Sequence, residues 1–147
     1  MFQRVTVVQS GLVLPRTATI IPQAGVKSLY TISGGAIVIL ELRAMVTTTI
    51  AGGANVTKFQ FKPPSVAAID LCATADINGL VPNQQIGVVG PAATALSTGY
   101  VIAGATSSPI VGPGTIDINC AAAAGTGALR FVLRYLNEDP NAMVVLS

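Results

Sequence analysis

The sequence predicts an all-β fold, either an antiparallel β-sandwich or a jelly roll. Apolar and polar residues alternate over short runs, and no long stretch shows the i, i+3, i+4 apolar spacing of a helix. Gly, Pro and Asn-Gly turn signals separate these runs at fairly regular spacing. We therefore expect about eight to ten strands that form one domain over residues 1–147.

The first part of the chain predicts three short strands. Residues 2–8 (FQRVTVV) form the first, which ends at Gln9–Ser10–Gly11. Residues 17–21 and 27–32 form the next two. Residues 33–35 (SGG) then predict a tight turn, because glycine allows the positive φ angles that such turns require.

Residues 36–50 are the longest predicted strand. The apolar run at its start (AIVIL) indicates burial on both faces, and β-branched threonines at its end suit a pleated strand. Its middle alternates and places charged and apolar side chains on opposite faces: Glu41 and Arg43 against Leu40, Leu42 and Ala44.

The central part predicts two more strands and a turn. Residues 55–62 alternate cleanly, and residues 66–75 are expected to alternate as well. The Asp76–Ile77–Asn78–Gly79 stretch is expected to be a turn capped by the aspartate. The expected faces are Phe59 and Phe61 against Lys58, Gln60 and Lys62, then Ile69 and Leu71 against Asp70 and Cys72.

Residues 80–114 predict a long irregular region, because Gly, Pro, Ser, Thr and Ala dominate it. Short strands are expected there at residues 85–89 and 100–103. Loops that join them are expected to serve function or to form an interface.

The last part predicts two clear strands. Residues 115–120 alternate, the alanine-rich stretch at 121–127 is expected to be a loop, and residues 128–136 are the clearest strand. Residues 141–147 (NAMVVLS) are apolar and uncharged, so we expect this tail to dock on another surface. The inward side chains of the last strand are expected to be Phe131, Leu133 and Tyr135, opposite Arg130, Val132 and Arg134.

The composition indicates a subunit of an assembly. The chain is 51% apolar and only 10% charged, with a mean hydropathy of +0.66, whereas about 25% charge is usual. No apolar run is long enough to span a bilayer, and the scattered basic residues form no patch for nucleic acid. The start of the chain lacks a signal-peptide pattern, so we expect synthesis in the cytoplasm. Such a chain is expected to bury much of its surface against other chains.

The residue inventory argues against catalysis. The chain has no histidine, which removes the commonest general base and metal ligand, and its glycine doublets lack a phosphate-binding spacing. Asp70, Asp76 and Asp117 could converge, but a turn cap and solvated or ion-paired strand positions explain them better. A calcium site near Asp76 and Asn78 would lack the full series of oxygen ligands. We therefore expect no catalytic, cofactor-binding or metal-binding residues, and no cofactor.

Two cysteines, Cys72 and Cys120, are too few for a disulfide framework. We expect two buried free thiols. A bridge between neighbouring strands is the alternative that the sequence leaves open.

Three segments carry a resemblance to a protein family. They are LYTISGGAIVILELRAMVTTTI, IDLCATADINGL and PGTIDINCAAAAGTGALRFVLRYL, which together span roughly residues 29 to 136. In their strands and turns they resemble small β-rich structural proteins of tailed bacteriophages. Leu80 stands where an acidic residue is more usual in that class, and Phe131 stands where tryptophan often falls.

The resemblance implies a virion protein without enzymatic activity, of the head decoration (cement) type. Such a protein would bind the major capsid protein on the outside of the head, stabilise the shell and form a homo-oligomer, with a trimer favoured. Residues 1–9 and 137–147 would then be contact arms that add strands to neighbouring sheets. The alternatives are a tail or fibre-associated subunit, possibly host-binding, and a non-phage binding module such as a lectin-like domain.

Overall fold

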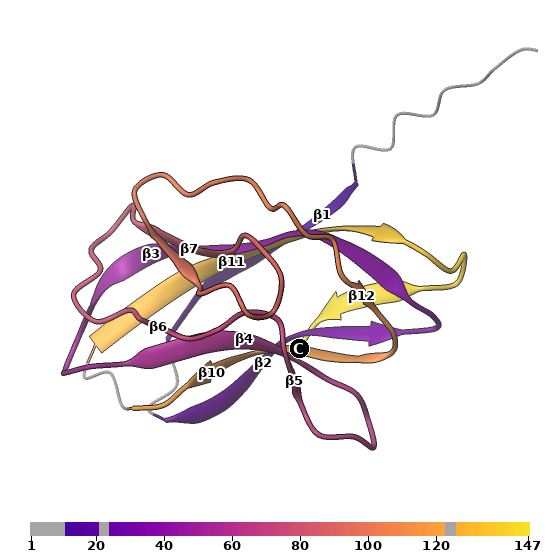
Figure 1. Ribbon diagram of the computed structural model, residues 1–147, viewed down its shortest axis with the longest axis horizontal. Helices are drawn as coiled ribbons and strands as arrows, with labels where there is room; N and C mark the ends of the chain where they lie inside the picture. The colour runs from indigo at the N-terminus through magenta and orange to yellow at the C-terminus, as the bar shows by residue number, and fades with distance from the viewer. Residues whose placement is uncertain (1–10, 21–23, 123–125) are drawn as a thin grey trace, which may run out of the picture.

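The computed structural model describes residues 11–20, 24–122 and 126–147, and it is a sandwich of two antiparallel sheets with six strands each (Figure 1). This confirms the predicted all-β class. The first sheet has the order β1-β11-β3-β7-β8, with β9 paired to β3. Its strands are β1 (Leu12–Ile20), β3 (Ile37–Ala51), β7 (Gln85–Val88), β8 (Ser97–Gly99), β9 (Ile110–Val111) and β11 (Thr126–Asn137).

The second sheet has the order β12-β2-β10-β4-β5, with β6 also paired to β4. Its strands are β2 (Gly25–Ser33), β4 (Val56–Lys62), β5 (Ile69–Asp70), β6 (Ala75–Asp76), β10 (Gly114–Cys120) and β12 (Met143–Leu146). Each sheet thus contains segments from both halves of the chain. The chain crosses between the sheets repeatedly, and this interleaving makes the described residues one sandwich.

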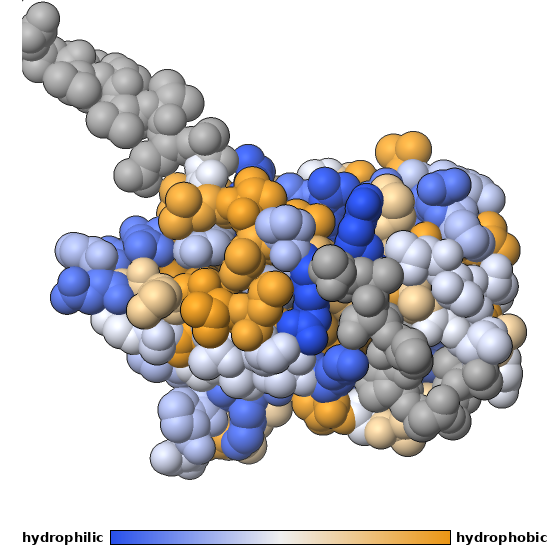
Figure 2. Space-filling model, turned by 180° about the vertical axis from the view of Figure 1, so that it is seen from behind, coloured by the Kyte–Doolittle hydropathy of each residue, from blue (hydrophilic) through white to orange (hydrophobic). Residues whose placement is uncertain are grey.

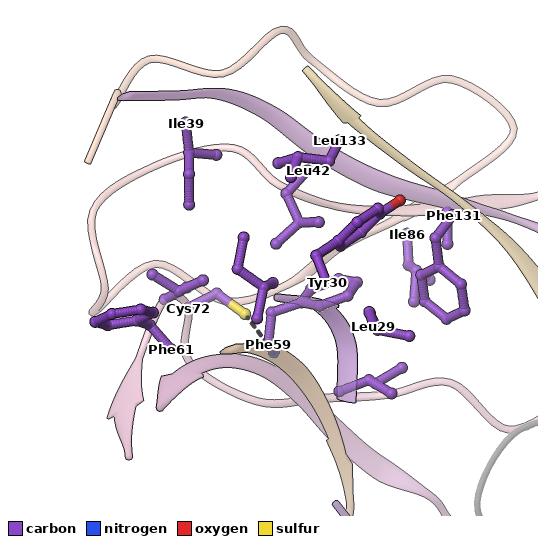
Figure 3. Packing of buried hydrophobic residues seen from close by; sticks show 14 of the residues in the cluster. Leu29, Tyr30, Ile39, Leu42, Phe59, Phe61, Cys72, Ile86, Phe131 and Leu133 are labelled. Atoms are coloured by element: carbon purple, nitrogen blue, oxygen red, sulfur yellow. Dashed lines mark hydrogen bonds between the residues drawn. The ribbon is translucent and has the colours of Figure 1, made fainter. Parts of the chain in front are cut away.

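The core fills the space between the sheets with the inward side chains that alternation predicts. Phe59 of β4 and Phe131 of β11 meet edge to face across it, with ring centroids 6.2 Å apart and planes at 87° (Figure 3). Tyr30, Leu42 and Ile86 are buried beside them. The predicted inward positions Phe61, Leu133 and Tyr135 are buried too, which confirms the faces assigned to residues 55–62 and 128–136.

The longest strand departs from simple alternation. In β3, Glu41 pairs with Arg134 whereas Ile39 pairs with Tyr135, so Leu40 is an extra residue opposite β11. Such a bulge shifts the side-chain alternation by one position. Leu40 therefore does not share the buried face of Leu42 and Ala44, and it is only half-buried. The prediction that these three residues share a face was wrong for Leu40.

The strand predicted over residues 66–75 was also wrong. The structure has only the two short strands β5 and β6 there, and the chain leaves the sheet between them. Ala73 donates its N–H to the carbonyl of Thr94 at 2.8 Å and accepts from the N–H of Leu96 at 3.0 Å. Because these loop contacts replace the ladder, Leu71 and Cys72 are both buried and Ile69 is exposed.

The irregular region after residue 80 contains three short strands. The predicted strand at residues 85–89 is confirmed as β7, but the strand predicted at residues 100–103 was wrong, since β8 (Ser97–Gly99) precedes it. The strand predicted at residues 17–21 begins earlier in the structure, at Leu12. The last two residues of the predicted loop at 121–127, Thr126 and Gly127, belong to β11. The predicted strand over residues 2–8 lies outside the described residues.

Candidate interaction surface

The two sheets end side by side at one open edge of the sandwich. β1 is the last strand of one sheet and β12 the last strand of the other. Figure 2 shows this edge, with a continuous run of apolar residues across it. The surface that β1 and β12 form together is called the open edge below.

Arg16 holds the two edge strands together. Its Nη1 donates to the carbonyl oxygen of Leu29 in β2 at 2.9 Å and to that of Ser147, just after β12, at 2.7 Å. The hydroxyl of Tyr30 donates to the carbonyl oxygen of Leu14 in β1 at 3.1 Å. These bonds link one sheet to the other at the open edge, although the strands belong to different ladders.

The C-terminal tail forms β12 because a short turn after β11 carries the chain to the second sheet, where it runs antiparallel to β2. Asn137 donates its side-chain N–H to the carbonyl of Ala142 at 2.9 Å, and Asp139 accepts the N–H of Ala36 at 2.7 Å. Gly34, at φ +75°, packs against this turn so closely that a Cβ atom would overlap the carbonyl oxygen of Asn141. The tail that the sequence predicted would dock therefore docks on its own sheet, with Val144 buried.

The open edge leaves large apolar side chains in solvent. Five of them have exposed fractions between 47% and 58%: Leu12, Val13, Met143, Val145 and Leu146. The one charged side chain on these two strands whose placement is described, Arg16, turns onto the backbone of the other sheet. A contiguous exposed apolar patch of this kind is typical of a protein–protein contact site.

The sequence prediction captured only half of this surface. It selected the apolar tail, but it missed Leu12, Val13 and Arg16, because the second strand was expected to begin only at residue 17. The signal was present in the apolar triplet at residues 12–14, followed by a proline, which is tolerated on edge strands.

The outer face of the second sheet is polar and internally bonded. Asp70 accepts from the Nζ of Lys58 at 2.9 Å and from the Nε2 of Gln60 at 2.8 Å, and Gln60 accepts from the side chain of Asn119 at 2.9 Å. Its bonds to Lys58 and Gln60 hold the pKa of Asp70 below its usual range. The polar groups of this row are therefore satisfied within the chain.

Asp117 differs from its prediction as a solvated or ion-paired position. It is buried, because β10 lies between β2 and β4, and its Oδ1 accepts from the hydroxyl of Ser28 at 2.9 Å. Asp117 and Asp70 lie on one cross-strand row with Gln60 between them, so their strands are roughly 10 Å apart. The aspartate side chains therefore form no close pair.

Asp76 caps its turn as predicted. Its Oδ1 accepts the backbone N–H of Asn55 at 2.8 Å and that of Asn78 at 2.9 Å, and these two bonds lower its pKa. Among the described residues, no group of three or more His, Cys, Asp or Glu side chains could hold a metal ion. The carboxylates considered for chemistry thus have structural partners instead.

Both cysteines are buried free thiols, which confirms the favoured prediction and excludes the bridge between them. Cys72 accepts the N–H of Phe59 at 3.4 Å, and Cys120 accepts the hydroxyl of Thr57 at 3.5 Å. Burial raises the pKa of each thiol. Neither sulfur has the lowered pKa and exposure of a reactive cysteine.

A hollow of about 410 Å³ lies on the outer face of the first sheet, beneath residues 101–105. Its floor carries Glu41, whose carboxylate pairs with Arg43 and lies 3.5 Å from the Nε of Arg134. The Nη1 of Arg43 also donates to Gln85 at 3.2 Å. The Glu41 carboxylate offsets one of the two guanidinium charges, so these three groups keep a net charge of +1, and their ion pairs hold them on the face of the sheet.

In comparisons with known proteins, no family model, no curated protein and no solved structure matches this chain. Within the part of the chain that the structure describes, no helix has the length and apolar character needed to cross a membrane.

Proposed function

We propose that this chain is a non-enzymatic structural subunit of a bacteriophage head, a decoration protein that binds the outside of the shell and stabilises it. The open edge carries this proposal. This surface combines five half-exposed apolar side chains with the outer edges of two strands, β1 and β12. The whole chain, moreover, has only 10% charged residues. Permanent assemblies use apolar, charge-poor contacts of this kind.

The resemblance of residues 29 to 136 to phage structural proteins suggests that the partners are other virion proteins. The major capsid protein would be the principal partner, with other copies of this chain as the second. At the open edge, β1 gives the capsid protein an apolar surface and backbone groups to which an extended segment could add. Residues 1–9 would extend this contact as an arm.

The decisive experiment mixes the purified protein with whole phage particles, heads and tails, that lack it. Bound copies are counted by mass spectrometry, and their location is imaged by electron cryomicroscopy. We expect a stoichiometry comparable with that of the shell protein and a higher temperature for release of packaged DNA. A few copies confined to the tail would favour the tail-subunit alternative, and no binding to any particle would overturn both.

The role of the open edge is tested by single substitutions and not by truncation. Deletion of residues 141–147 would remove β12 and expose the buried Ile32. Val13→Lys introduces a charge at a half-exposed position of β1 and should weaken head binding while the fold persists. Val66→Lys is the matched control, since Val66 is equally exposed in a loop between β4 and β5. Deletion of residues 1–9 tests the arm separately.

A further inference from the structure

β12 is an unprotected strand edge. Among the described strands it pairs only with β2, and its sequence, Met143–Leu146, contains no charge, proline or glycine. Natural sheets protect such edges with charges, proline, bulges or very short strands. β12 is itself short, with four residues, but it is longer than β8 with three and β5 with two, and it lacks the proline that β1 carries at Pro15.

Apolar side chains surround the free edge of β12. Three of the five half-exposed apolar side chains of the open edge lie on β12 itself: Met143, Val145 and Leu146. In a pair of strands they add apolar burial to the backbone hydrogen bonds of the shared edge, and a standard stable interface buries roughly 800 Å² per partner. β12 itself carries no charged side chain, and the guanidinium of Arg16 from β1 is held on the backbone oxygens of Leu29 and Ser147.

We propose that two copies of this chain pair through β12, antiparallel about a two-fold axis, and join their second sheets into one continuous sheet. Each β12 then supplies the partner that the other lacks, so the contact removes both unprotected edges. An unrelated partner segment would need its own second edge covered, whereas the two-fold pair is closed. This pairing deepens the proposed function, on which its role in a particle rests.

The register follows from the length of the free edge. The uncovered stretch at residues 143–147 is centred on Val145, which is about half exposed, whereas its neighbour Val144 is buried. A two-fold axis through the middle therefore places Val145 opposite its equivalent in the other copy. Met143 and Val145 then extend one apolar row across the contact, on the outer face of the second sheet.

The test is the mass of the isolated protein and of two matched variants in sedimentation velocity. We expect a dimer for the wild type and at least about tenfold weaker dimerisation for Val145→Lys, because two like charges meet at the axis. Val101→Lys places the same charge at a position that is 89% exposed in a distant loop, and it should leave the dimer intact. Thermal unfolding verifies that both variants fold.

A cysteine at the same position gives an independent readout. Val145→Cys should form a disulfide-linked dimer under mild oxidation, because the two introduced thiols face each other at the axis. Val101→Cys should not, because its thiol lies away from the axis. The native Cys72 and Cys120 do not interfere, because both are buried. A wild-type monomer, a trimer that Val145→Lys leaves intact, or equal cross-linking of both variants would overturn the pairing. A monomer that still binds heads would reject the pairing alone, and a dimer that binds no particle would reject the head assignment alone.

Discussion

The guanidinium of Arg16 donates to the carbonyl oxygen of Ser147 at 2.7 Å, and so joins the edge strands of two different sheets. The same nitrogen donates to Leu29 at 2.9 Å. Together with the hydrogen bond from Tyr30 to Leu14, these bonds join the two sheets at the open edge.

Arg16→Met should destabilise the protein by about 1–2 kcal/mol, because hydrogen bonds from a charged group are lost while the apolar stem remains. The loss should be local, so amide exchange in β12 should rise more than exchange in β11. Urea unfolding and hydrogen exchange measure the two effects. Arg130→Met is the control, since Arg130 is exposed and donates only weakly to the sulfur of Met45; its cost should stay within about 0.5 kcal/mol.

Tyr30 should make the protein sensitive to alkaline pH. Burial raises its pKa from 10.0 to about 12, although the nearby charge of Arg16 offsets part of this rise. The unfolded chain therefore loses this proton first. Stability from this group is fully present below pH 10 and is lost as the pH rises towards 12, at up to about 1.4 kcal/mol per pH unit.

Tyr30→Phe tests this pH dependence. The variant should lose about 1 kcal/mol at neutral pH, because Leu14 loses its hydroxyl donor, but its stability should fall less steeply above pH 10. Urea unfolding between pH 8 and pH 11 gives both slopes. Equal slopes for wild type and variant would mean that Tyr30 does not titrate differently on folding.

The core-forming strands were predictable from sequence because their alternation is set by burial of one face. Phe59, Phe131 and Leu133 fall on the faces that the pattern assigns. The bulge at Leu40 was not predictable, since an extra residue in β3 becomes visible only against its partner β11. Residues 66–75 failed for a related reason: hydrogen bonds to Thr94 and Leu96 form through tertiary contact and leave no local pattern.

The interaction surface was predictable only in part. The apolar, uncharged tail pointed to docking, and the structure places it on β2. Its position beside β1 depends on Arg16, whose partner Ser147 lies 131 residues away in sequence. No local pattern encodes such a pairing, so the two halves of the open edge could not be brought together from the sequence.

Asp76 should support the turn between β6 and β7 in a pH-dependent way. Because backbone N–H groups of Asn55 and Asn78 bond its carboxylate, its folded pKa lies below the ordinary 3.8. Its contribution is present above the ordinary value and is lost as the pH falls through the folded value. Asp76→Ala should lower the melting temperature at pH 7, and the difference from wild type should shrink in acid. Asp76→Asn keeps one acceptor oxygen and should retain part of the effect.

The two cysteines should be silent to thiol reagents until the protein unfolds. Both are buried, and burial raises the pKa of each, so few thiolates form at pH 8 and none is reachable. We expect almost no reaction with a chromogenic disulfide in native buffer and two reactive thiols per chain in denaturant. Cys120→Ser should lower the free energy of unfolding more than Cys120→Ala does. The serine hydroxyl is strongly polar, and it would be buried among core side chains beside the hydroxyl of Thr57. Rapid native labelling of one thiol would show that the sandwich opens locally near that strand, and a single thiol in denaturant would contradict the free state of both.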